Sequence, residues 1–379
     1  FDKLRRQRRW KKRFRRMVAA VLVLAIGAAL LFTAAVVYQL DLVTQGQNFV
    51  ASLRPGEGFP ISIRDVKVRE LLPIGRDVVL VSDSGTFVYN RHGALLTTQV
   101  NQYAHPVVRV SGGKILAYDL GGTGLQVDNE AKLLHTLTTP GRIYAADLSP
   151  SGHVATAVAA DGFLARVTVY TPQMEERYNW YTGECYITSL SLSQRGDSFC
   201  AAGVSGGEGG RLTGHLRFHH TGQEEEAAKV LLPDELVLSV AWTKEDKVQV
   251  VTDRAAYVFD ADGRELAKVS VPADLSLVEN SPEGGLYLAH GDHRGGSGAA
   301  IEAYNADLEL VGSYHTDRRI LSLEFTDGRL LVLTEGQLLL GDGMLAQVQE
   351  RRSGDLYYVC AAGNTIYGIT PEGLVRESL

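Results

Sequence analysis

Hydrophobic and polar residues follow one pattern from residue 61 to the C-terminus. Short runs rich in Val, Leu, Tyr and Thr alternate with turns of Gly, Asp, Asn and Ser, about ten residues apart. We find no stretch with the 3.6-residue period of an amphipathic helix there. This pattern is typical of an all-β sandwich, barrel or propeller.

A longer period distinguishes between these folds. A strand, a polar turn and a return strand recur at spacings of 36 to 49 residues, which is the length of a four-stranded propeller blade. A sandwich would not repeat one unit so many times. The segments are FVYNRHGALL (87–96), LQVDNEAKLL (125–134), VTVYTPQMEE (167–176), LRFHHTGQEE (216–225), YVFDADGREL (257–266), EAYNADLELV (302–311) and LLLGDGMLAQ (338–347).

Apolar strands that precede these segments predict the number of blades. We expect eight innermost strands, and the last unit has room for only three strands before the chain ends. The sequence therefore predicts an eight-bladed β-propeller, with seven blades as the alternative, in which a strand near 60–64 completes the last blade. The innermost strands are VKVRELLPIG, HPVVRVSGG, IYAADLSPSG, YITSLSLSQRGD, LVLSVAWTKED, LSLVENSPEG, ILSLEFTDG and YYVCAAG.

The uncharged stretch Met17–Tyr38 precedes this region. As a helix it would be about 33 Å long, enough to cross a bilayer core of about 30 Å. A basic tail precedes it, and no Lys or Arg follows until Arg54, which predicts a cytoplasmic N-terminus. The residues that set this topology are Lys3, Arg5, Arg6, Arg8, Arg9, Lys11, Lys12, Arg13, Arg15 and Arg16.

A cleaved signal peptide is the alternative for this stretch. The stretch exceeds the roughly 7–15 apolar residues of signal peptides, and Thr33-Ala34-Ala35 lies inside it. We therefore expect a retained anchor in the cell membrane, with the C-terminal domain outside the cytoplasm. The predicted parts are a basic tail (1–16), a transmembrane signal-anchor helix (17–38), a juxtamembrane linker, partly ordered at most (39–58), and the propeller (59–379).

Charge is distributed unevenly along the chain. The first 16 residues carry ten basic side chains and one acid, which leaves 28 basic and 43 acidic residues beyond them, a net charge near −15. Nucleic-acid binding by the large domain is not expected, because neutralising phosphates needs a basic surface. The tail itself fits contact with anionic lipid headgroups.

The three cysteines do not form a metal-binding pattern. Cys185, Cys200 and Cys360 lie among small and apolar residues, which predicts buried, unpaired side chains on strands. A disulfide between Cys185 and Cys200 is the alternative.

Histidines give weak metal candidates. His290, Asp292 and His293 in LAHGDHRGG would be the ligands if this loop curls, but no further ligands are identifiable. Adjacent residues on a strand face opposite sides, so we expect one of His219 and His220 to be packed and the other solvated.

Two motifs resemble catalytic ones. Ser205 occupies the nucleophile position of a Gly-x-Ser-x-Gly match, but a Gly-rich hairpin follows it where a nucleophile elbow needs a helix. Asp147, Glu279 and Glu324 lie on or just after innermost strands and are weak candidates for acids near the central axis, as in propeller glycosidases.

Turn composition accounts for the remaining motifs. The segments 118–124 and 204–214 are Gly-rich but lack the helix of a phosphate-binding loop, so hairpins are expected. Arg195-Gly196-Asp197 is likewise expected in a tight turn and not as an adhesion motif.

The basic tail, the anchor helix and a divergent propeller opening with FPISI resemble a family of bacterial, mainly Gram-positive, single-pass membrane proteins of unknown function. The repeats are more distantly similar to WD-repeat and quinoprotein-like propellers, although the WD dipeptide and the repeated tryptophan pattern are absent. The resemblance implies a fold and a location and carries over no activity, cofactor or functional residue.

From these observations we expect a binding or scaffold module at the cell envelope, with a protein or envelope polymer as its partner. The alternative is an enzyme or small-ligand sensor that uses the central pocket of the propeller. No catalytic set and no cofactor emerge from the residues, which favours the first interpretation.

Overall fold

A computed structural model describes residues 42–63, 66–100, 103–291 and 298–378. The chain divides into two compact units, 1–47 and 48–379. The predicted tail and membrane-spanning stretch lie outside the described residues. Within the described ranges, no helix is long and apolar enough to cross a membrane.

The described part of the second unit is built almost entirely of antiparallel strands in eight sheets. The first four sheets comprise β1 (Val68–Ile74), β2 (Asp77–Ser82), β3 (Gly85–Tyr89), β4 (Leu95–Val100); β5 (Pro106–Ser111), β6 (Lys114–Asp119), β7 (Gly124–Asn129), β8 (Leu133–Thr138); β9 (Ile143–Leu148), β10 (Val154–Ala160), β11 (Phe163–Tyr170), β12 (Glu176–Thr182); and β13 (Tyr186–Leu192), β14 (Ser198–Gly206), β15 (Leu212–His220), β16 (Ala228–Pro233).

The last four sheets comprise β17 (Val237–Trp242), β18 (Lys247–Thr252), β19 (Ala255–Asp260), β20 (Glu265–Ser270); β21 (Leu275–Asn280), β22 (Leu286–His290), β23 (Ala299–Tyr304), β24 (Leu310–Thr316); β25 (Ile320–Thr326), β26 (Arg329–Thr334), β27 (Gln337–Asp342), β28 (Val348–Arg352); and the three-stranded β29 (Tyr358–Ala362), β30 (Thr365–Thr370), β31 (Gly373–Ser378). A short 3₁₀ helix, η1 (Glu208–Gly210), lies between β14 and β15, and helix α2 (Leu42–Ser52) precedes the strands.

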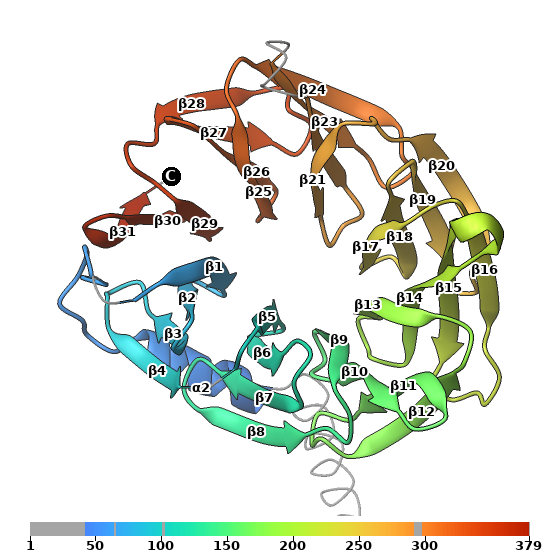
Figure 1. The fold of residues 1–379 in the computed structure, drawn as a ribbon. Helices are drawn as coiled ribbons and strands as arrows, with labels where there is room; N and C mark the ends of the chain where they lie inside the picture. The colour runs from blue at the N-terminus through green and yellow to red at the C-terminus, as the bar shows by residue number, and fades with distance from the viewer. Residues whose placement is uncertain (1–41, 64–65, 101–102, 292–297, 379) are drawn as a thin grey trace, which may run out of the picture. The chain divides into compact units, whose positions relative to one another are not determined.

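Figure 1 shows these sheets arranged as blades around a central axis, with the first strand of each blade innermost. The prediction of eight blades is confirmed. All eight predicted innermost strands are found, as β1, β5, β9, β13, β17, β21, β25 and β29. The repeated sequence segments coincide with the hairpins between third and fourth strands.

Where a closing strand near 60–64 was predicted, the N-terminal segment joins the last blade through one isolated bridge, and the last sheet itself has three strands. Ile61 pairs with Leu374 of β31, and their backbone N–H groups donate reciprocally to each other's carbonyls at 2.9 Å. Phe59 packs against Tyr367 of the last blade, with ring centroids 5.7 Å apart. Pairing the edge of the three-stranded sheet protects it from other chains.

The core lies between the blades. Buried apolar side chains of the described residues form eight clusters, one at each contact between neighbouring blades. Second and third strands are buried on both faces; β2, for example, is buried along its whole length. Each blade therefore depends on its neighbours to bury its apolar faces.

Short polar side chains shape the turns. The side chain of Asn90 accepts hydrogen bonds from the N–H groups of His92 and Ala94, both at 2.9 Å, between β3 and β4. Asn129, Asp260, Asn305 and Asp342 act in the same way in four other blades. This is the turn chemistry that makes the repeat visible in the sequence.

Strand direction gives the ring two faces. One face carries the turns between first and second strands and between third and fourth strands, and we call it the hairpin face. The other carries the turns between second and third strands and the connections between blades, and we call it the crossover face.

Helix α2 lies within the segment that the sequence assigns to a partly ordered linker, and the sequence did not predict it. Its last residues, 48–52, belong to the second unit and contact the hairpin face of blades 1 and 2. Asn48 donates to the Gly113 carbonyl at 2.8 Å, and Ala51 is buried in the cluster between these blades.

Candidate functional site: the central cavity and the crossover face

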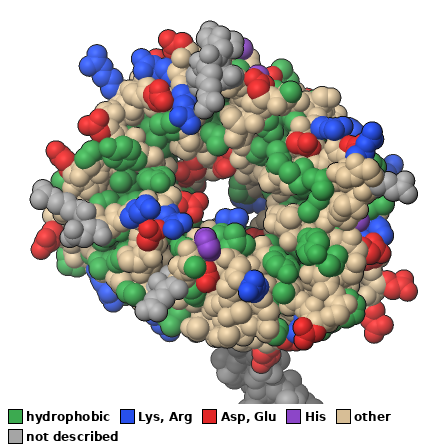
Figure 2. Space-filling model, in the orientation of Figure 1, with side chains coloured by type: hydrophobic (Ala, Val, Ile, Leu, Met, Phe, Trp, Pro, Cys, Tyr) green, Lys and Arg blue, Asp and Glu red, His purple; other side chains and the backbone are tan. Residues whose placement is uncertain are grey.

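The innermost strands of blades 1–6 enclose a cavity of about 820 Å³. Figure 2 shows the opening at the centre of the ring, with acidic and basic side chains at its edge. The charged residues that line the cavity are Glu70, Arg109, Asp147, Lys244 and Glu279.

The predicted acids hold neighbouring blades together. A side chain at one position of the inner strand accepts a hydrogen bond from a backbone N–H of the next inner strand. We call this position the clasp position. The four contacts are Asp147 Oδ2 with Leu192 N (2.8 Å), Ser191 Oγ with Trp242 N (2.8 Å), Glu279 Oε1 with Phe325 N (3.0 Å) and Glu324 Oε1 with Ala361 N (3.4 Å).

The protein around the cavity shifts the pKa values of the carboxyl groups on the inner strands. Burial raises the pKa of Glu279 to about 7, and it raises the pKa of Glu324 well above its usual range, with smaller contributions from the charges of Glu279 and Glu70. Burial also raises the pKa of Glu70 and Asp147, against the opposing effect of the Arg109 guanidinium.

The inner strands carry a second regular feature. Six of them contain a β-bulge near their first residue, which leaves one residue without a partner on the next strand. Bulges bend a strand and redirect a side chain, and they occur often beside binding sites. The unpaired residues are Arg69, Tyr144, Thr188, Leu238, Ser276 and Leu321.

Glu70 and Arg109 were missed by the sequence reasoning. Both lie on predicted innermost strands, and the same signal that selected Asp147, a charged residue within an apolar inner strand, would have found them.

Ser205 does contact a base. Its hydroxyl lies 2.8 Å from His215 Nε2, across the hairpin of β14 and β15. His215 Nδ1 is buried, and none of the described groups hydrogen-bonds to it in the way that a triad carboxylate would. The strand–hairpin–strand context is as predicted, and this pair does not make a hydrolase site.

The histidine prediction at 219 and 220 is confirmed. His219 is fully buried, stacks on Phe199 at 4.8 Å and contacts the Tyr178 hydroxyl at 3.1 Å through Nδ1. Burial lowers the pKa of His219 to about 3. His220 is partly exposed and pairs with Asp262 at 3.0 Å.

His290 lies 3.5 Å from Glu302 and 3.8 Å from Asp274. Asp292 and His293, the other residues of the weak metal candidate, lie outside the described residues. Among the residues that are described, no group of three or more metal ligands occurs. All three cysteines are buried and unpaired.

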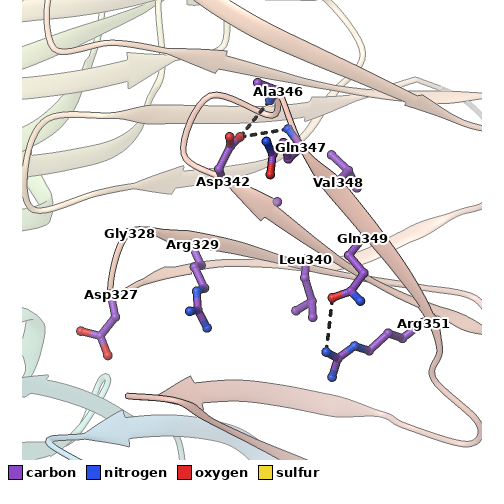
Figure 3. Close-up of a pocket in the computed structure, with 11 residues that line it drawn as sticks. Asp327, Gly328, Arg329, Leu340, Asp342, Ala346, Gln347, Val348, Gln349 and Arg351 are labelled. Carbon is purple, nitrogen blue, oxygen red and sulfur yellow. Dashed lines mark hydrogen bonds between the residues drawn. The ribbon is translucent and has the colours of Figure 1, made fainter. Parts of the chain in front are cut away.

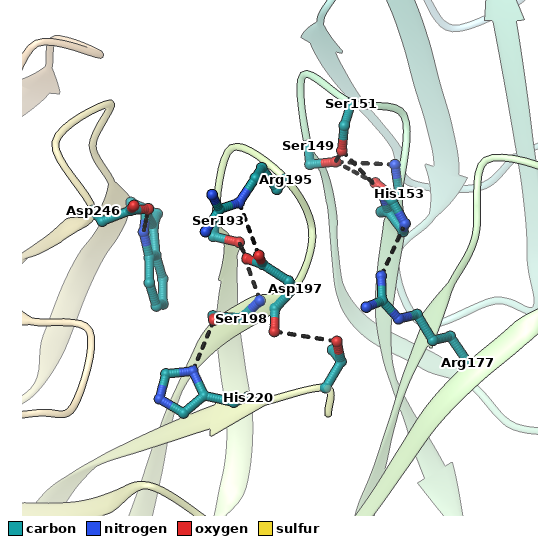
Figure 4. Close-up of polar contacts among 12 residues, drawn as sticks. Ser149, Ser151, His153, Arg177, Ser193, Arg195, Asp197, Ser198, His220 and Asp246 are labelled. Atoms are coloured by element: carbon teal, nitrogen blue, oxygen red, sulfur yellow. Dashed lines mark hydrogen bonds and ion pairs between the residues drawn. The ribbon is translucent and has the colours of Figure 1, made fainter. Parts of the chain in front are cut away.

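Figure 4 shows that Arg195-Gly196-Asp197 lies in a tight turn between β13 and β14. Asp197 accepts hydrogen bonds from the Ser193 hydroxyl (2.8 Å) and from Arg195 Nε (2.9 Å). Gly196 has a φ of 66°, which favours glycine. The carboxylate is thus used within its own turn.

A second cavity lies on blade 7 (Figure 3), with a volume of about 870 Å³. Its polar groups largely bond to each other. Asp342 accepts from the N–H of Ala346 at 2.8 Å, and Arg351 donates to Gln349 at 3.3 Å. All the residues that line it belong to one blade, whereas the central cavity collects side chains from six, so it is the weaker candidate.

Apolar side chains are exposed on the crossover face of blades 3–5. Phe163 and Tyr181 are about half exposed and contact each other, with ring centroids 5.0 Å apart, and Arg166 lies over the Tyr181 ring. Exposed apolar groups of this kind mark interaction surfaces. We call this set the crossover patch: Phe163, Tyr181, Tyr186, Leu212, Leu236 and Leu238.

Comparison with known proteins agrees with the fold. Residues 61–344 match a family described only as being of unknown function, DUF5711. No curated protein sequence matches the chain.

Two solved structures are similar to the chain. One is Sqt1 of Saccharomyces cerevisiae, with a TM-score of 0.62 and 11% identity, covering 84% of this chain and 97% of that one. The other is the C-terminal WD40 domain of Sif2, with a TM-score of 0.59 and 10% identity, covering 85% and 99%. At this identity the likeness concerns the WD40-like fold alone.

Proposed function

The chain belongs to the family of unknown function DUF5711, and we propose that it is a binding or scaffold module displayed outside the cytoplasm by a membrane helix. Its partner in this proposal is a protein or polymer of the cell envelope.

The crossover patch carries the proposal. Tyr186 is 55% exposed and Leu238 49% exposed. Aromatic residues and an adjacent arginine are the side chains most enriched where protein partners bind. The central acids favour the same interpretation, since Asp147, Glu279 and Glu324 bond to the next blade and are not arranged as a nucleophile and its base.

The anchor and its orientation rest on the sequence. The 22 uncharged residues suffice to span a bilayer, and the basic flank favours a cytoplasmic N-terminus. Protease treatment of intact cells tests this topology, because a fully protected propeller would contradict it.

The binding role is tested by replacing Tyr186 and Leu212, which is 48% exposed, with Asp, because Leu238 also lines the central cavity. The matched control replaces Leu310 and Met344, equally exposed residues outside the crossover patch, with Asp. Purification from crosslinked membranes is expected to recover the same specific partner with the unmodified chain and the control, and to lose it with the patch variant. Recovery of no specific partner, or equal recovery by both variants, would contradict the proposal.

A second candidate function is favoured by the central cavity. Its volume fits a small ligand, and Glu70, Asp147 and Arg109 provide acceptors and donors inside it. We propose as the alternative that a small polar molecule binds there. Equilibrium binding of candidate sugars to the unmodified chain and to Glu70→Gln tests it; affinities that do not differ would place the ligand elsewhere.

A further inference from the structure

The last turn of helix α2 and the residue that follows it expose apolar side chains. Phe49 and Val50 are each 67% exposed and Leu53 is 52% exposed. The helix contains no charged residue. A monomeric water-soluble surface rarely leaves three large apolar side chains together, so this surface needs an explanation.

The opposite side of the same segment is fixed on the ring. Asn48 donates to the Gly113 carbonyl at 2.8 Å and accepts from the Glu130 N–H at 3.2 Å. Ser52 donates to Asp77 at 3.3 Å, and Ala51 is 3% exposed. These contacts all lie on turns of the hairpin face, so Phe49, Val50 and Leu53 are held pointing away from it.

The surroundings of this surface are basic. The acids in the contacted turns, Asp77 and Glu130, are buried, and the exposed charged neighbours are four cations and one acid, Glu57. Leu95 and Leu133, at the hairpin face of the same two blades, add exposed apolar area. The exposed basic residues in these segments are Arg54, Arg76, Lys132 and Arg376, the last of which donates to the Arg91 carbonyl at 2.9 Å.

Apolar side chains with an excess of Lys and Arg around them match the interface of an anionic bilayer, where the apolar groups enter the headgroup boundary and the cations meet phosphates. Chain length supplies an independent argument. The uncharged stretch ends at Tyr38 and the helix begins at Leu42, so at most about 15 Å of chain separates them. Phe49 follows about 10 Å further along the helix.

We infer that Phe49, Val50 and Leu53 lie in the headgroup region of the bilayer that anchors the chain. The hairpin face of blades 1 and 2 then points to the membrane, and the crossover patch points away from it toward partners. This inference rests on the proposed function, because it requires that residues 17–38 span the membrane.

The experiment places a fluorescent probe on each face of the full chain. Val50→Cys labels the helix, and Leu120→Cys, 41% exposed in the turn between β6 and β7, is the matched control on the crossover face. The native Cys185, Cys200 and Cys360 are fully buried and do not compete for the label. The labelled chains are reconstituted in vesicles of anionic lipid, with and without a quencher attached to lipid headgroups.

We expect the probe at position 50 to lose more than half of its fluorescence to the quencher, and the probe at position 120 to lose less than one tenth. Replacing the anionic lipid by a zwitterionic one is expected to weaken the first effect. Equal quenching at both positions, or none at position 50, would overturn the inference.

Flotation of the same vesicles separates this inference from its premise. If the chain does not float with the lipid, the anchoring in the proposed function is wrong, and the inference falls with it. If the chain floats but the probe at position 50 is not quenched, anchoring stands and only the orientation is wrong.

Discussion

The stability of the ring should depend on pH through the buried pair Asp77 and Glu130. Asp77 is 0% exposed and Glu130 5% exposed. Asp77 Oδ1 accepts from Arg91 N at 3.0 Å, but its Oδ2 is buried without a partner of hydrogen-bonding geometry. Burial and the neighbouring Asp77 raise the pKa of Glu130 to about 8, so near neutral pH Glu130 carries a proton.

The sign follows from comparing the two states. The folded-state pKa of Glu130 lies above its unfolded value of 4.5, so the folded state keeps a proton that the unfolded state releases. Protonated Glu130 therefore makes its full contribution to the free energy of unfolding below pH 4.5. This contribution is lost as the pH rises through 8. At 1.36 kcal/mol per pH unit the loss is on the order of 5 kcal/mol, as an upper bound for a coupled buried pair.

Glu130→Gln tests this directly. The amide has the same size, can donate to Asp77 Oδ2 and does not titrate. The free energy of unfolding, measured with urea from pH 5 to pH 9, is expected to decline less in the variant than in the unmodified chain. The difference between the two free energies should therefore grow by roughly 3 kcal/mol or more across this range. Asp128 and Glu279, whose pKa values burial raises to about 7, remain in both chains and cancel in the difference.

The control is Glu57→Gln, which makes the same substitution at an exposed position. A difference for Glu130→Gln that is constant from pH 5 to pH 9 would show that Glu130 titrates normally, and the argument from burial would be wrong.

Three further predictions concern the ring. Ser191→Ala removes the acceptor of the buried Trp242 N–H and should cost about 1–3 kcal/mol in urea unfolding, while the exposed Thr98→Ala should stay within about 0.5 kcal/mol; equal costs would refute the role of the clasp position. The pKa of His219 is about 3 in the folded state and 6.5 in the unfolded state, so the free energy of unfolding should decrease as the pH drops from 6.5, by about 2 kcal/mol at pH 5. His219→Gln should reduce this decrease. Identical dependence on pH in the variant and the unmodified chain would contradict the prediction. Ile61→Pro deletes an N–H that donates to Leu374, and should lower the melting temperature and promote self-association in light scattering, whereas Ser62→Ala should do neither; a monomer of unchanged stability would mean that closure does not depend on this strand.

Much of the fold is predictable because a blade is specified locally. The Asn90 and Asp260 turns take their conformation from one short side chain each, and such turns recur at the repeat length. Helix α2 was not predictable in this way. Its sequence, LVTQGQNFVAS, has a glycine and β-branched residues and no charged caps, and its last turn is held by Asn48 and Ala51 against the ring.

The site was predictable only in part, for a related reason. The sequence placed Asp147, Glu279 and Glu324 on inner strands, but the groups they bond to lie 37 to 46 residues away, in the next blade. The local sequence pattern shows that a charged residue lies on an inner strand, but it does not show which groups that residue contacts. The crossover patch has the same property, because its residues come from three blades.

The clasp position also explains why the N-terminal segment matters to the whole ring. In blades 1–8 it is occupied by Leu72, Arg109, Asp147, Ser191, Ala241, Glu279, Glu324 and Cys360. Blades 8, 1, 2 and 5 thus lack the carboxylate or hydroxyl acceptor that blades 3, 4, 6 and 7 use, and the first three of these are consecutive around the ring.

Two of the contacts between blades that lack a clasp are bridged by the N-terminal segment. The strand at Ile61 joins blade 8 to blade 1, and Asn48 with Ser52 joins blade 1 to blade 2 through Gly113, Glu130 and Asp77. The residues that bridge these two contacts therefore follow, in the sequence, the stretch that the proposed function places in the membrane. Under the proposed function, attachment and closure depend on the same short piece of chain, so a change in residues 48–61 should alter both the stability of the propeller and its position on the membrane.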